Sequence, residues 1–309
     1  MSEWKNKRIA VLYGGPSSER EISLVTGQAI FDALRERGYD AFLIDVGPDV
    51  ADRLRAERAD VAFIGLHGRI GEDGCIQGLL EVMRIPYTGS GVLASAMALN
   101  KEVSKQMFQA RGIPTPMSRF FPAEKARGVR PEDLPFGLPA VVKPVAEGSS
   151  VGVSIVREAS ALAPALEEAA SFGGVLVEAY VRGMEVHVAI LDDEPLGAIQ
   201  VIPAAEFYDF NAKYQSGGTT QYVFPAPLEP RLEARVLEAA KSAHLALGCS
   251  GYSRVDTLVD PESGKVWVIE VNTLPGMTPT SLVPKVAAGR GIDFGSLCER
   301  ILHTASLEN

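Results

Sequence analysis

The sequence predicts an α/β protein, and three observations support this fold class. An apolar run at residues 8–13 is followed by a segment of helical period at 19–37 and by a second apolar run at 41–46. This order is typical of a β-α-β unit, which a third apolar run at 61–66 extends by another parallel strand. From Gly183 onward, strand-like segments predominate.

A chain of 309 residues with 46% hydrophobic content can bury more than one core, so we expect two or three domains. We expect a first α/β domain over residues 1–98, ending after a turn of glycine and proline. Two α+β domains should follow, over residues 99–183 and 184–309.

Further elements follow from the periodicity of apolar residues. We expect helices at 101–111, 159–171 and 231–247, and strands at 140–144, 153–156, 175–178, 185–191 and 196–202. The polar, proline-rich connection through Pro139 should be irregular. The long polar and aromatic segment at 204–224 should be a lid loop.

The composition excludes several classes of protein. A net charge of −9 and a pI near 5.1 argue against nucleic acid or an anionic membrane as the main partner. No segment approaches the length of about 18 apolar residues that a membrane span needs. Cys75, Cys249 and Cys298 are too far apart for a disulfide framework or a zinc site, so we expect small core residues. We therefore expect a cytoplasmic protein.

The most informative segments lie near the C-terminus. Residues 254–256 and 270–272 alternate polar with apolar side chains, and the turn at 260–264 between them predicts a hairpin. Asp256, Glu270 and Asn272 would then lie side by side, with Arg254 adjacent. Oxygen ligands beside an arginine suit Mg²⁺ bound to phosphates. A solvated hairpin face is the alternative.

The segment 148–152, rich in glycine and serine, could fold its backbone N–H groups around phosphate oxygens. It is not a Walker A motif, and a simple turn between two strands is the alternative. Lys143 favours a phosphate site, because a lysine in an apolar strand must reach water or an anion. Together with Lys101, Lys143 could neutralise an α- or β-phosphate.

Two residues near the ends of the first strands are candidates for substrate binding. Glu19 follows the glycine turn after the first strand and could hold an ammonium group, or could simply be a favourable first-turn acid on a helix. His67 follows a strand of the same sheet, so it lies at the same edge. It is a substrate ligand or a structural histidine.

Two further segments lie where they could reach the same ligand. In the lid loop, Lys213 and Tyr214 are candidates for reaching over a nucleotide, or they are an exposed lysine and a packed tyrosine. The residues after Asn272 offer backbone amides and hydroxyl groups suited to an oxyanion or a carboxylate.

Taken together, these segments resemble the D-alanine–D-alanine ligases of the ATP-grasp family, from residue 13 to residue 284. The matching motifs are Gly-Gly-Pro-Ser-Ser-Glu-Arg-Glu (14–21), Leu-His-Gly (66–68), Gly-Glu-Asp-Gly (71–74), Tyr-Thr-Gly-Ser-Gly (87–91), Val-Val-Lys-Pro (141–144), Glu-Gly-Ser-Ser-Val-Gly (147–152), Phe-Tyr-Asp-Phe-Asn-Ala-Lys-Tyr (207–214), Arg-Val-Asp (254–256) and Glu-Val-Asn-Thr-Leu-Pro-Gly-Met-Thr (270–278). Each motif is weak alone, but their order and spacing are specific.

The resemblance implies a three-domain ATP-grasp architecture whose last two domains enclose a nucleotide. It also implies a two-step reaction in peptidoglycan precursor synthesis. ATP would phosphorylate the carboxylate of one D-alanine, and the amine of a second D-alanine would displace the phosphate. The cofactors would be ATP and two Mg²⁺, with Mn²⁺ as a substitute, and the protein would be a homodimer.

The resemblance also assigns residues to roles. For the nucleotide, Lys101, Lys143 and Lys213 would contact phosphates, Glu178, Ala179 and Val181 the adenine, and Glu185 the ribose. For the amino acids, Glu19 would hold the first ammonium with His67 nearby, and Ser281 and Leu282 would receive the second carboxylate. Arg254 and the Gly276 backbone would stabilise oxygen charge, Asp256, Glu270 and Asn272 would bind the metals, and Ser149 would link Glu19 to Tyr214.

The sequence is compatible with two other functions. A D-alanine–D-lactate ligase would share the fold, although the resemblance links a lid tyrosine such as Tyr214 to dipeptide formation. A nucleotide-binding regulatory protein without catalysis should have lost a metal ligand or Arg254, and the sequence retains them all.

At residue 179 many relatives carry a lysine, so a side-chain contact to adenine cannot come from Ala179.

Overall fold

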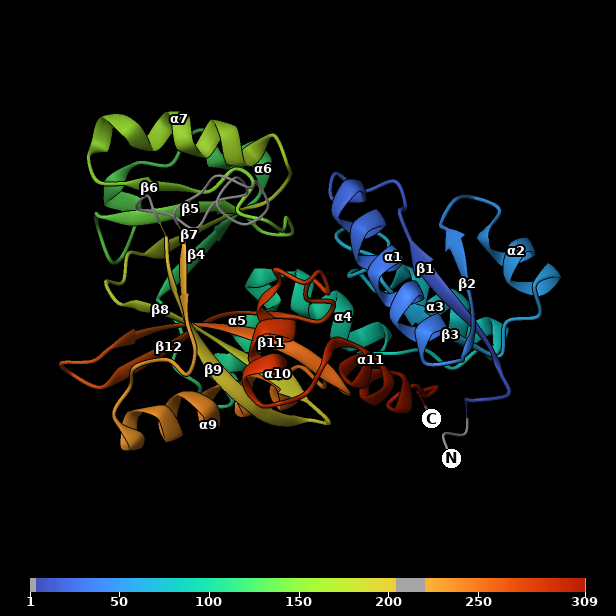
Figure 1. The fold of residues 1–309 in the computed structure, drawn as a ribbon. Helices are drawn as coiled ribbons and strands as arrows, with labels where there is room; N and C mark the ends of the chain where they lie inside the picture. Colours follow the sequence, from blue (N-terminus) through green and yellow to red (C-terminus); the bar gives the residue numbers. More distant parts are fainter. Residues whose placement is uncertain (1–3, 204–219, 309) are drawn as a thin grey trace.

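The computed structural model describes residues 4–203 and 220–308. Over these residues the chain builds three β-sheets of three, four and five strands (Figure 1). In Figure 1 the three-stranded sheet and its helices form one side of the molecule, and the two larger sheets form the other. The predicted α/β class is confirmed.

The first sheet is parallel, as the sequence predicts, with the order β2-β1-β3. Its elements are β1 (Arg8–Tyr13), α1 (Arg20–Glu36), β2 (Asp40–Asp45), α2 (Val50–Ala56) and β3 (Val61–Ile64). The interior residues of the central strand β1 are fully buried, because helices cover the sheet. The carboxyl ends of β1 and β3 therefore carry Glu19 and His67 to the same edge.

Three helices connect this sheet to the next: α3 (Cys75–Met83), α4 (Val92–Leu99) and α5 (Lys101–Ala110). The sequence predicts only the last of them. Asn100 caps α5, because its side chain accepts a hydrogen bond from the backbone N–H of Val103 at 3.1 Å. Cys75 is exposed at the start of α3, so the expectation of a core residue was wrong there, whereas Cys249 and Cys298 are buried.

The second sheet is antiparallel, with the order β4-β7-β5-β6. Its elements are β4 (Ser118–Phe121), α6 (Ala123–Ala126), the 3-10 helix η1 (Pro131–Asp133), β5 (Ala140–Pro144), β6 (Ser154–Val156), α7 (Ala159–Ala170) and β7 (Val175–Ala179). The stretch expected to be irregular thus contains an edge strand and two short helices. The proline-rich local sequence did not predict these elements. Strand β4 is stabilised by pairing with β7, which is more than fifty residues away in the chain.

The third sheet is antiparallel, with the order β10-β9-β8-β11-β12. Its elements are β8 (Met184–Leu191), β9 (Glu194–Ile202), β10 (Gln221–Val223), α9 (Pro230–Ala246), β11 (Tyr252–Asp260) and β12 (Lys265–Asn272). The buried face of α9 packs on β8, β9, β11 and β12. Strand β10 lies inside the segment 204–224 that was expected to be a lid loop, so that expectation was wrong for residues 221–223, and residues 204–219 lie outside the described residues.

The C-terminal helix α10 (Leu282–Gly289) packs on β8 and β9 of the third sheet, and α11 (Phe294–His303) returns to the first sheet's side of the molecule. Helix α11 packs on α1, and Arg37 forms an ion pair with Asp293 at 2.6 Å and another with Glu299. The core around β1 therefore includes C-terminal residues. We propose that the domain boundaries lie at residues 98 and 183, which separate the three sheets along the chain.

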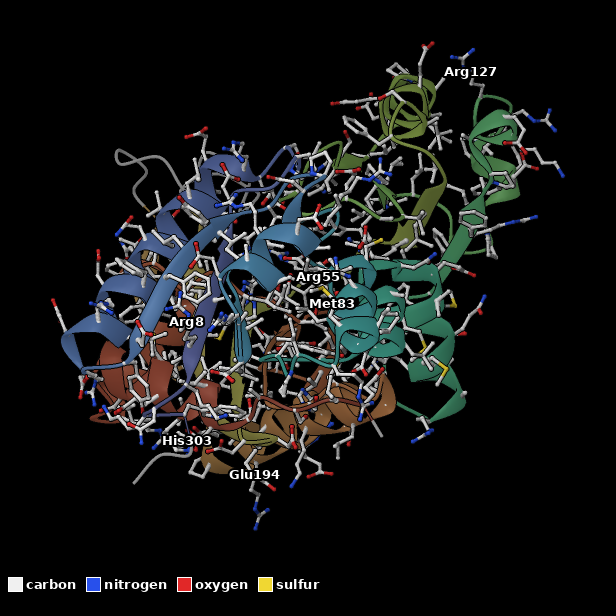
Figure 2. The ribbon with its side chains drawn as sticks, turned by 90° about the vertical axis from the view of Figure 1, so that its right-hand side faces the viewer. Arg8, Arg55, Met83, Arg127, Glu194 and His303 are labelled. Atoms are coloured by element: carbon white, nitrogen blue, oxygen red, sulfur yellow. The ribbon has the colours of Figure 1, made fainter. Side chains whose placement is uncertain are left out.

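The outer surface is charged, as the negative net charge leads one to expect. Figure 2 shows Arg127 at the outer end of the second sheet's part of the molecule and Glu194 at the opposite end. None of the helices in the described ranges is both long and apolar enough to cross a lipid bilayer.

Candidate active site

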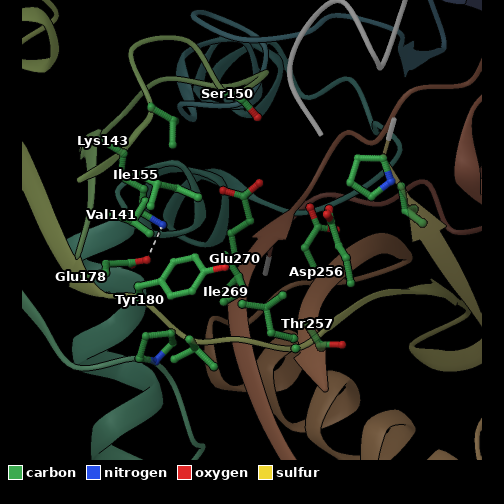
Figure 3. Close-up of a pocket in the computed structure, with 18 of the residues that line it drawn as sticks. Val141, Lys143, Ser150, Ile155, Glu178, Tyr180, Asp256, Thr257, Ile269 and Glu270 are labelled. Carbon is green, nitrogen blue, oxygen red and sulfur yellow. Dashed lines mark ion pairs between the residues drawn. The ribbon is translucent and has the colours of Figure 1, made fainter. Parts of the chain in front are cut away.

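Strands β11 and β12 form the predicted hairpin, and their register decides which side chains meet. Asp256 lies opposite Glu270, and Arg254 lies opposite Asn272. Residues opposite each other in a sheet share a face, so all four side chains point the same way. Figure 3 shows the carboxylates of Asp256 and Glu270 side by side in the pocket.

The carboxylate of Asp256 is buried and surrounded by donors. Arg254 donates through Nε to Oδ1 at 2.6 Å and through Nη2 to Oδ2 at 2.7 Å, and Asn272 donates to Oδ2 at 3.2 Å. Burial raises the pKa of Asp256, but the positive charges of Arg254 and His187 outweigh it and hold the pKa well below its usual value. Asp256 is therefore an anion at neutral pH.

His187 on β8 is a site residue that sequence reasoning missed. Its Nδ1 lies 2.6 Å from Asp256 Oδ1, and its Nε2 lies 2.8 Å from Glu185 Oε1. Burial lowers the pKa of His187, but attraction to Asp256 and hydrogen bonds to both carboxylates raise it overall. The alternation of Glu185 and His187 with valines along β8 is a signal that could have identified it.

A cavity of about 470 Å³ lies between the second and third sheets. It brings together most residues that the sequence assigns to a nucleotide: Lys101, Lys143, Glu178, Ala179, Val181, Glu185, Asp256 and Glu270 all line it. Its volume and its mixture of apolar walls and charged groups fit a nucleotide.

Lys143 reaches an anion, as a lysine in a buried strand must, but in this structure the anion is Glu178. Lys143 Nζ lies 2.9 Å from Glu178 Oε2 (Figure 3), and Lys105 Nζ lies 3.0 Å from Glu178 Oε1. Although burial raises the pKa of Glu178, the two lysines hold it below its usual value. Burial also lowers the pKa of Lys105 to about 8. Sequence reasoning missed Lys105, which reads as an ordinary helix residue.

Lys101 connects the glycine-rich loop to the hairpin. Its Nζ donates to the backbone carbonyl of Glu147 at 2.7 Å and lies 3.5 Å from Glu270 Oε2. This position places a positive charge beside a candidate metal ligand and beside the loop expected to bind phosphate.

The glycine-rich loop between β5 and β6 has an unusual backbone. Ser149 and Ser150 have φ values of +49° and +59°, in the left-handed region that residues other than glycine rarely adopt. The turn aims the Ser149 hydroxyl at Glu19, to which it donates a hydrogen bond. Strained backbone in a loop beside a cavity supports a functional assignment.

A smaller pocket of about 60 Å³ adjoins this loop. Its lining includes the residues that the sequence assigns to the amino-acid substrates: Glu19, His67, Ser149, Arg254, Asn272, Gly276, Ser281 and Leu282. The two pockets share Gly148, Ser149 and Glu270 as lining residues, so the large and small pockets meet at the glycine-rich loop and β12.

His67 is buried and held in place by its neighbours. Its Nε2 lies 2.9 Å from Thr26 Oγ1, and its Nδ1 lies 3.1 Å from the Leu274 carbonyl and 3.6 Å from Glu72. Burial raises the pKa of Glu72, a pocket residue that the sequence indicates only as part of the motif at 71–74. His67 is therefore held in place by structural contacts and also lines the small pocket.

The segment after β12 is ordered by its own hydroxyl groups. Ser281 Oγ accepts a hydrogen bond from the backbone N–H of Thr278 at 3.1 Å and lies 2.8 Å from Thr278 Oγ1. Gly276 leaves room for this arrangement, because a Cβ there would lie 2.7 Å from Ser281 Oγ. Lys213 and Tyr214 lie outside the described residues.

The metal-binding hypothesis depends on an unusual donor set. Within residues 4–203 and 220–308, no three His, Cys, Asp or Glu side chains are grouped so as to hold a metal ion. The candidate set has two carboxylates and one amide, and an ion with few protein ligands would take its remaining oxygens from phosphates. That donor chemistry fits Mg²⁺.

A parallel first sheet followed by two antiparallel sheets around a charged, nucleotide-sized cavity defines the ATP-grasp class of ligases. Two family models match the chain: "D-ala D-ala ligase C-terminus" over residues 107–303 and "D-ala D-ala ligase N-terminus" over residues 48–90. The chain belongs to the D-alanine–D-alanine ligase family.

Relatives match over the whole chain. A D-alanine–D-alanine ligase of Anaeromyxobacter sp. (strain K) is 59% identical over 100% of both chains. The crystal structure of the Bacillus anthracis D-alanine–D-alanine ligase is 38% identical, covers 96% of this chain and 97% of that one, and has a TM-score of 0.86. A Bacillus anthracis D-alanine–D-alanine ligase complexed with ATP is 35% identical, covers 96% of this chain and 97% of that one, and has a TM-score of 0.83. The predicted resemblance and architecture are confirmed.

Proposed function

We propose that this protein joins two D-alanine molecules into D-alanyl-D-alanine with cleavage of ATP to ADP and phosphate, for peptidoglycan precursors. One observation carries the proposal beyond family membership. The nucleotide-sized cavity and the small pocket share Gly148, Ser149 and Glu270, so a terminal phosphate and a small carboxylate would meet there. Such proximity is what a transfer between them needs.

The reaction balances in two steps. A carboxylate oxygen of the first D-alanine attacks the γ-phosphorus of ATP, and ADP leaves with the electrons of the broken P–O bond. The amine of the second D-alanine then attacks the carbonyl carbon of D-alanyl phosphate. The C–O bond to phosphate breaks, and the amine releases its extra proton.

The nucleotide would occupy the large cavity. Adenine would lie against Glu178, Ala179 and Val181, with the ribose on Glu185. Lys101 and Lys143 would contact phosphates, together with Lys213 of the segment outside the described residues. Lys143 already points into the cavity from its ion pair with Glu178, so it can share its charge with a phosphate oxygen.

Asp256, Glu270 and Asn272 would hold two Mg²⁺, with Mn²⁺ as a substitute. Bound there, the ions would neutralise negative charge on the phosphate oxygens. The anionic state of Asp256 and the alignment of Glu270 with it across the hairpin support this assignment.

The amino acids would occupy the small pocket. Glu19 would receive the ammonium of the first D-alanine, with His67 on the same side. Arg254 and the backbone N–H of Gly276 would stabilise oxygen charge during both steps. Ser281 and Leu282, at the start of α10, would receive the carboxylate of the second D-alanine, and Ser149 would connect Glu19 to Tyr214.

The proposal is tested by measuring ADP release with D-alanine, D-lactate and L-alanine as substrates at neutral pH. We expect release that depends on D-alanine, with D-alanyl-D-alanine identified by mass. A product of D-alanine and D-lactate alone would assign the protein to depsipeptide synthesis. Absence of ADP release with D-alanine would refute the ligase function.

We further propose a homodimer that works in the cytoplasm. Two large apolar side chains, Val82 on α3 and Leu93 on α4, are 84% and 66% exposed on helices that contact each other. They are the contact residues that we propose for the interface between copies, which the family resemblance implies. The three free cysteines fit a reducing compartment, and ATP is available there. Light scattering on the purified protein should give twice the mass of one chain, and Val82→Lys should give a monomer.

A further inference from the structure

His187 lies directly behind the wall of the nucleotide-sized cavity. Its side chain is 1% exposed, whereas both of its carboxylate partners, Glu185 and Asp256, line the cavity. One nitrogen of the ring is bonded to each: Nδ1 to Asp256 at 2.6 Å and Nε2 to Glu185 at 2.8 Å. The ring therefore spans two cavity residues that come from different strands.

The sheet register produces this arrangement. Glu185 and His187 are two residues apart on β8 and so share a face of the sheet. Across the neighbouring strand pair, His187 lies opposite Asp256, and Asp256 in turn lies opposite Glu270. A continuous row of side chains thus runs from Glu185 through His187 and Asp256 to Glu270.

We infer that His187 is a positioning residue. Its rigid ring fixes the carboxylate of Glu185 and the carboxylate of Asp256 relative to each other. This inference rests on the proposed function, in which Glu185 holds the ribose and Asp256 holds Mg²⁺. Glu185 depends on the ring more than Asp256 does, because Asp256 is also held by Arg254 and Asn272. Residues that orient metal ligands from behind affect metal affinity without touching the ion.

Two substitutions separate the two contacts. An asparagine side chain places its amide nitrogen near the position of Nδ1, and a glutamine side chain places it near Nε2. His187→Asn should therefore keep the contact to Asp256 and lose the contact to Glu185, whereas His187→Gln should do the reverse. His187→Ala removes both.

The readout is binding measured by calorimetry without D-alanine, so it does not depend on turnover. The probes are ADP, 2′-deoxy-ADP and 3′-deoxy-ADP, each titrated at a series of Mg²⁺ concentrations. The wild type should bind ADP more tightly than at least one deoxy analogue. The two measured quantities are this affinity ratio and the Mg²⁺ concentration that half-saturates ADP binding.

We expect His187→Asn to bring the affinity ratio close to 1 with little change in the Mg²⁺ requirement. We expect His187→Gln to retain the ratio and to need roughly 10- to 100-fold more Mg²⁺, the usual range for lost support of a metal ligand. His187→Ala should show both changes. Thermal melting of each variant reports whether it is folded.

His244 supplies a matched control, because it is also buried and also bonded through both ring nitrogens, in its case to a hydroxyl and a carboxylate. Its Nδ1 lies 2.8 Å from Ser253 Oγ and its Nε2 lies 3.2 Å from Asp193 Oδ1, outside the site. His244→Asn and His244→Gln should leave both quantities unchanged. The inference would be overturned if His187→Asn and His187→Gln changed both measured quantities equally, in proportion to their loss of stability. Wild-type values of both quantities in the Asn, Gln and Ala variants would also overturn it. A wild type that binds no ADP and releases none with D-alanine would instead refute the proposed function.

Discussion

The Ser149 hydroxyl donates a hydrogen bond to the Glu19 carboxylate, 130 residues away in the chain. This contact joins the glycine-rich loop of the second sheet to the start of α1 on the first sheet. A Cβ at Gly148 would lie 3.0 Å from Glu19 Oε2, so the loop and the carboxylate are also close packed. Two parts of the molecule with separate cores thus meet at a candidate substrate ligand.

Ser149→Ala should lower kcat/KM for D-alanine by roughly 10- to 100-fold, because a hydrogen bond to a charged group contributes about 1.5–3 kcal/mol. The KM for ATP should change less, because the hydroxyl that is lost bonds to Glu19, which lines only the small pocket, although Ser149 itself lines both pockets. Steady-state kinetics with each substrate varied would measure both. Ser171→Ala, on an exposed serine bonded to the adjacent helix turn, is the control. An equal loss of kcat/KM for D-alanine and for ATP would contradict the assignment of Glu19 to the amino-acid substrate.

Glu270→Gln and Asp256→Asn should each lower the rate by at least about 100-fold while the protein stays folded, because charge neutralisation at phosphates supplies several kcal/mol. Raising the Mg²⁺ concentration should recover part of the rate in Glu270→Gln. Glu262→Gln, in the exposed turn of the same hairpin, should behave as the wild type. Wild-type rates in the two site variants would mean that the metal ligands lie elsewhere.

The ion triad of Lys105, Glu178 and Lys143 should make stability depend on pH in the alkaline range. The pKa of Lys105 is about 8 in the folded protein, against 10.5 for an ordinary lysine side chain in the unfolded chain. Between these two values the unfolded chain binds more protons, so the free energy of unfolding should rise with pH. The rise due to Lys105 is up to about 3 kcal/mol across that window.

Urea unfolding of the wild type and of Lys105→Met at several pH values from 8 to 10.5 would measure this contribution. The difference in unfolding free energy between the two proteins should change with pH in that window. Lys125→Met, at an exposed lysine, should show no such change relative to the wild type. Parallel curves for the wild type and Lys105→Met would contradict the depressed pKa of Lys105.

Gly276→Ala should raise the KM for the second D-alanine about 10-fold or more with a smaller effect on ATP, because the added methyl displaces Ser281 Oγ. A misplacement of this kind commonly costs up to about 100-fold in rate. Gly78→Ala, at a helix position with nothing within 4 Å of the new Cβ, is the control. Unchanged kinetics for the acceptor would place the second substrate away from Ser281.

Much of the fold could be predicted from local pattern. The β-α-β unit, the hairpin at residues 252–272 and helix α9 follow from period-2 and period-3.6 alternation, and each was confirmed. Strand β4 and the helices α3 and α10 were missed, because they are short and depend on packing against distant elements.

The residues of the candidate site divide in the same way. The identities and the faces of Asp256, Glu270 and Arg254 are evident from alternation in the sequence. His187 and Lys105 are not, because a buried histidine or lysine is informative only when its partners are known. Their partners, Asp256 and Glu178, are 69 and 73 residues away.

The sequence by itself determined the class of the protein, the hairpin and the order of the motifs, because residue type and spacing are local properties. Only the tertiary structure decided which charges pair. Lys143 meets Glu178, and His187 joins Glu185 to Asp256, because the registers of β5 with β7 and of β8 with β11 bring those side chains together. Strand register depends on the packing of whole sheets, and alternation along one strand cannot specify it.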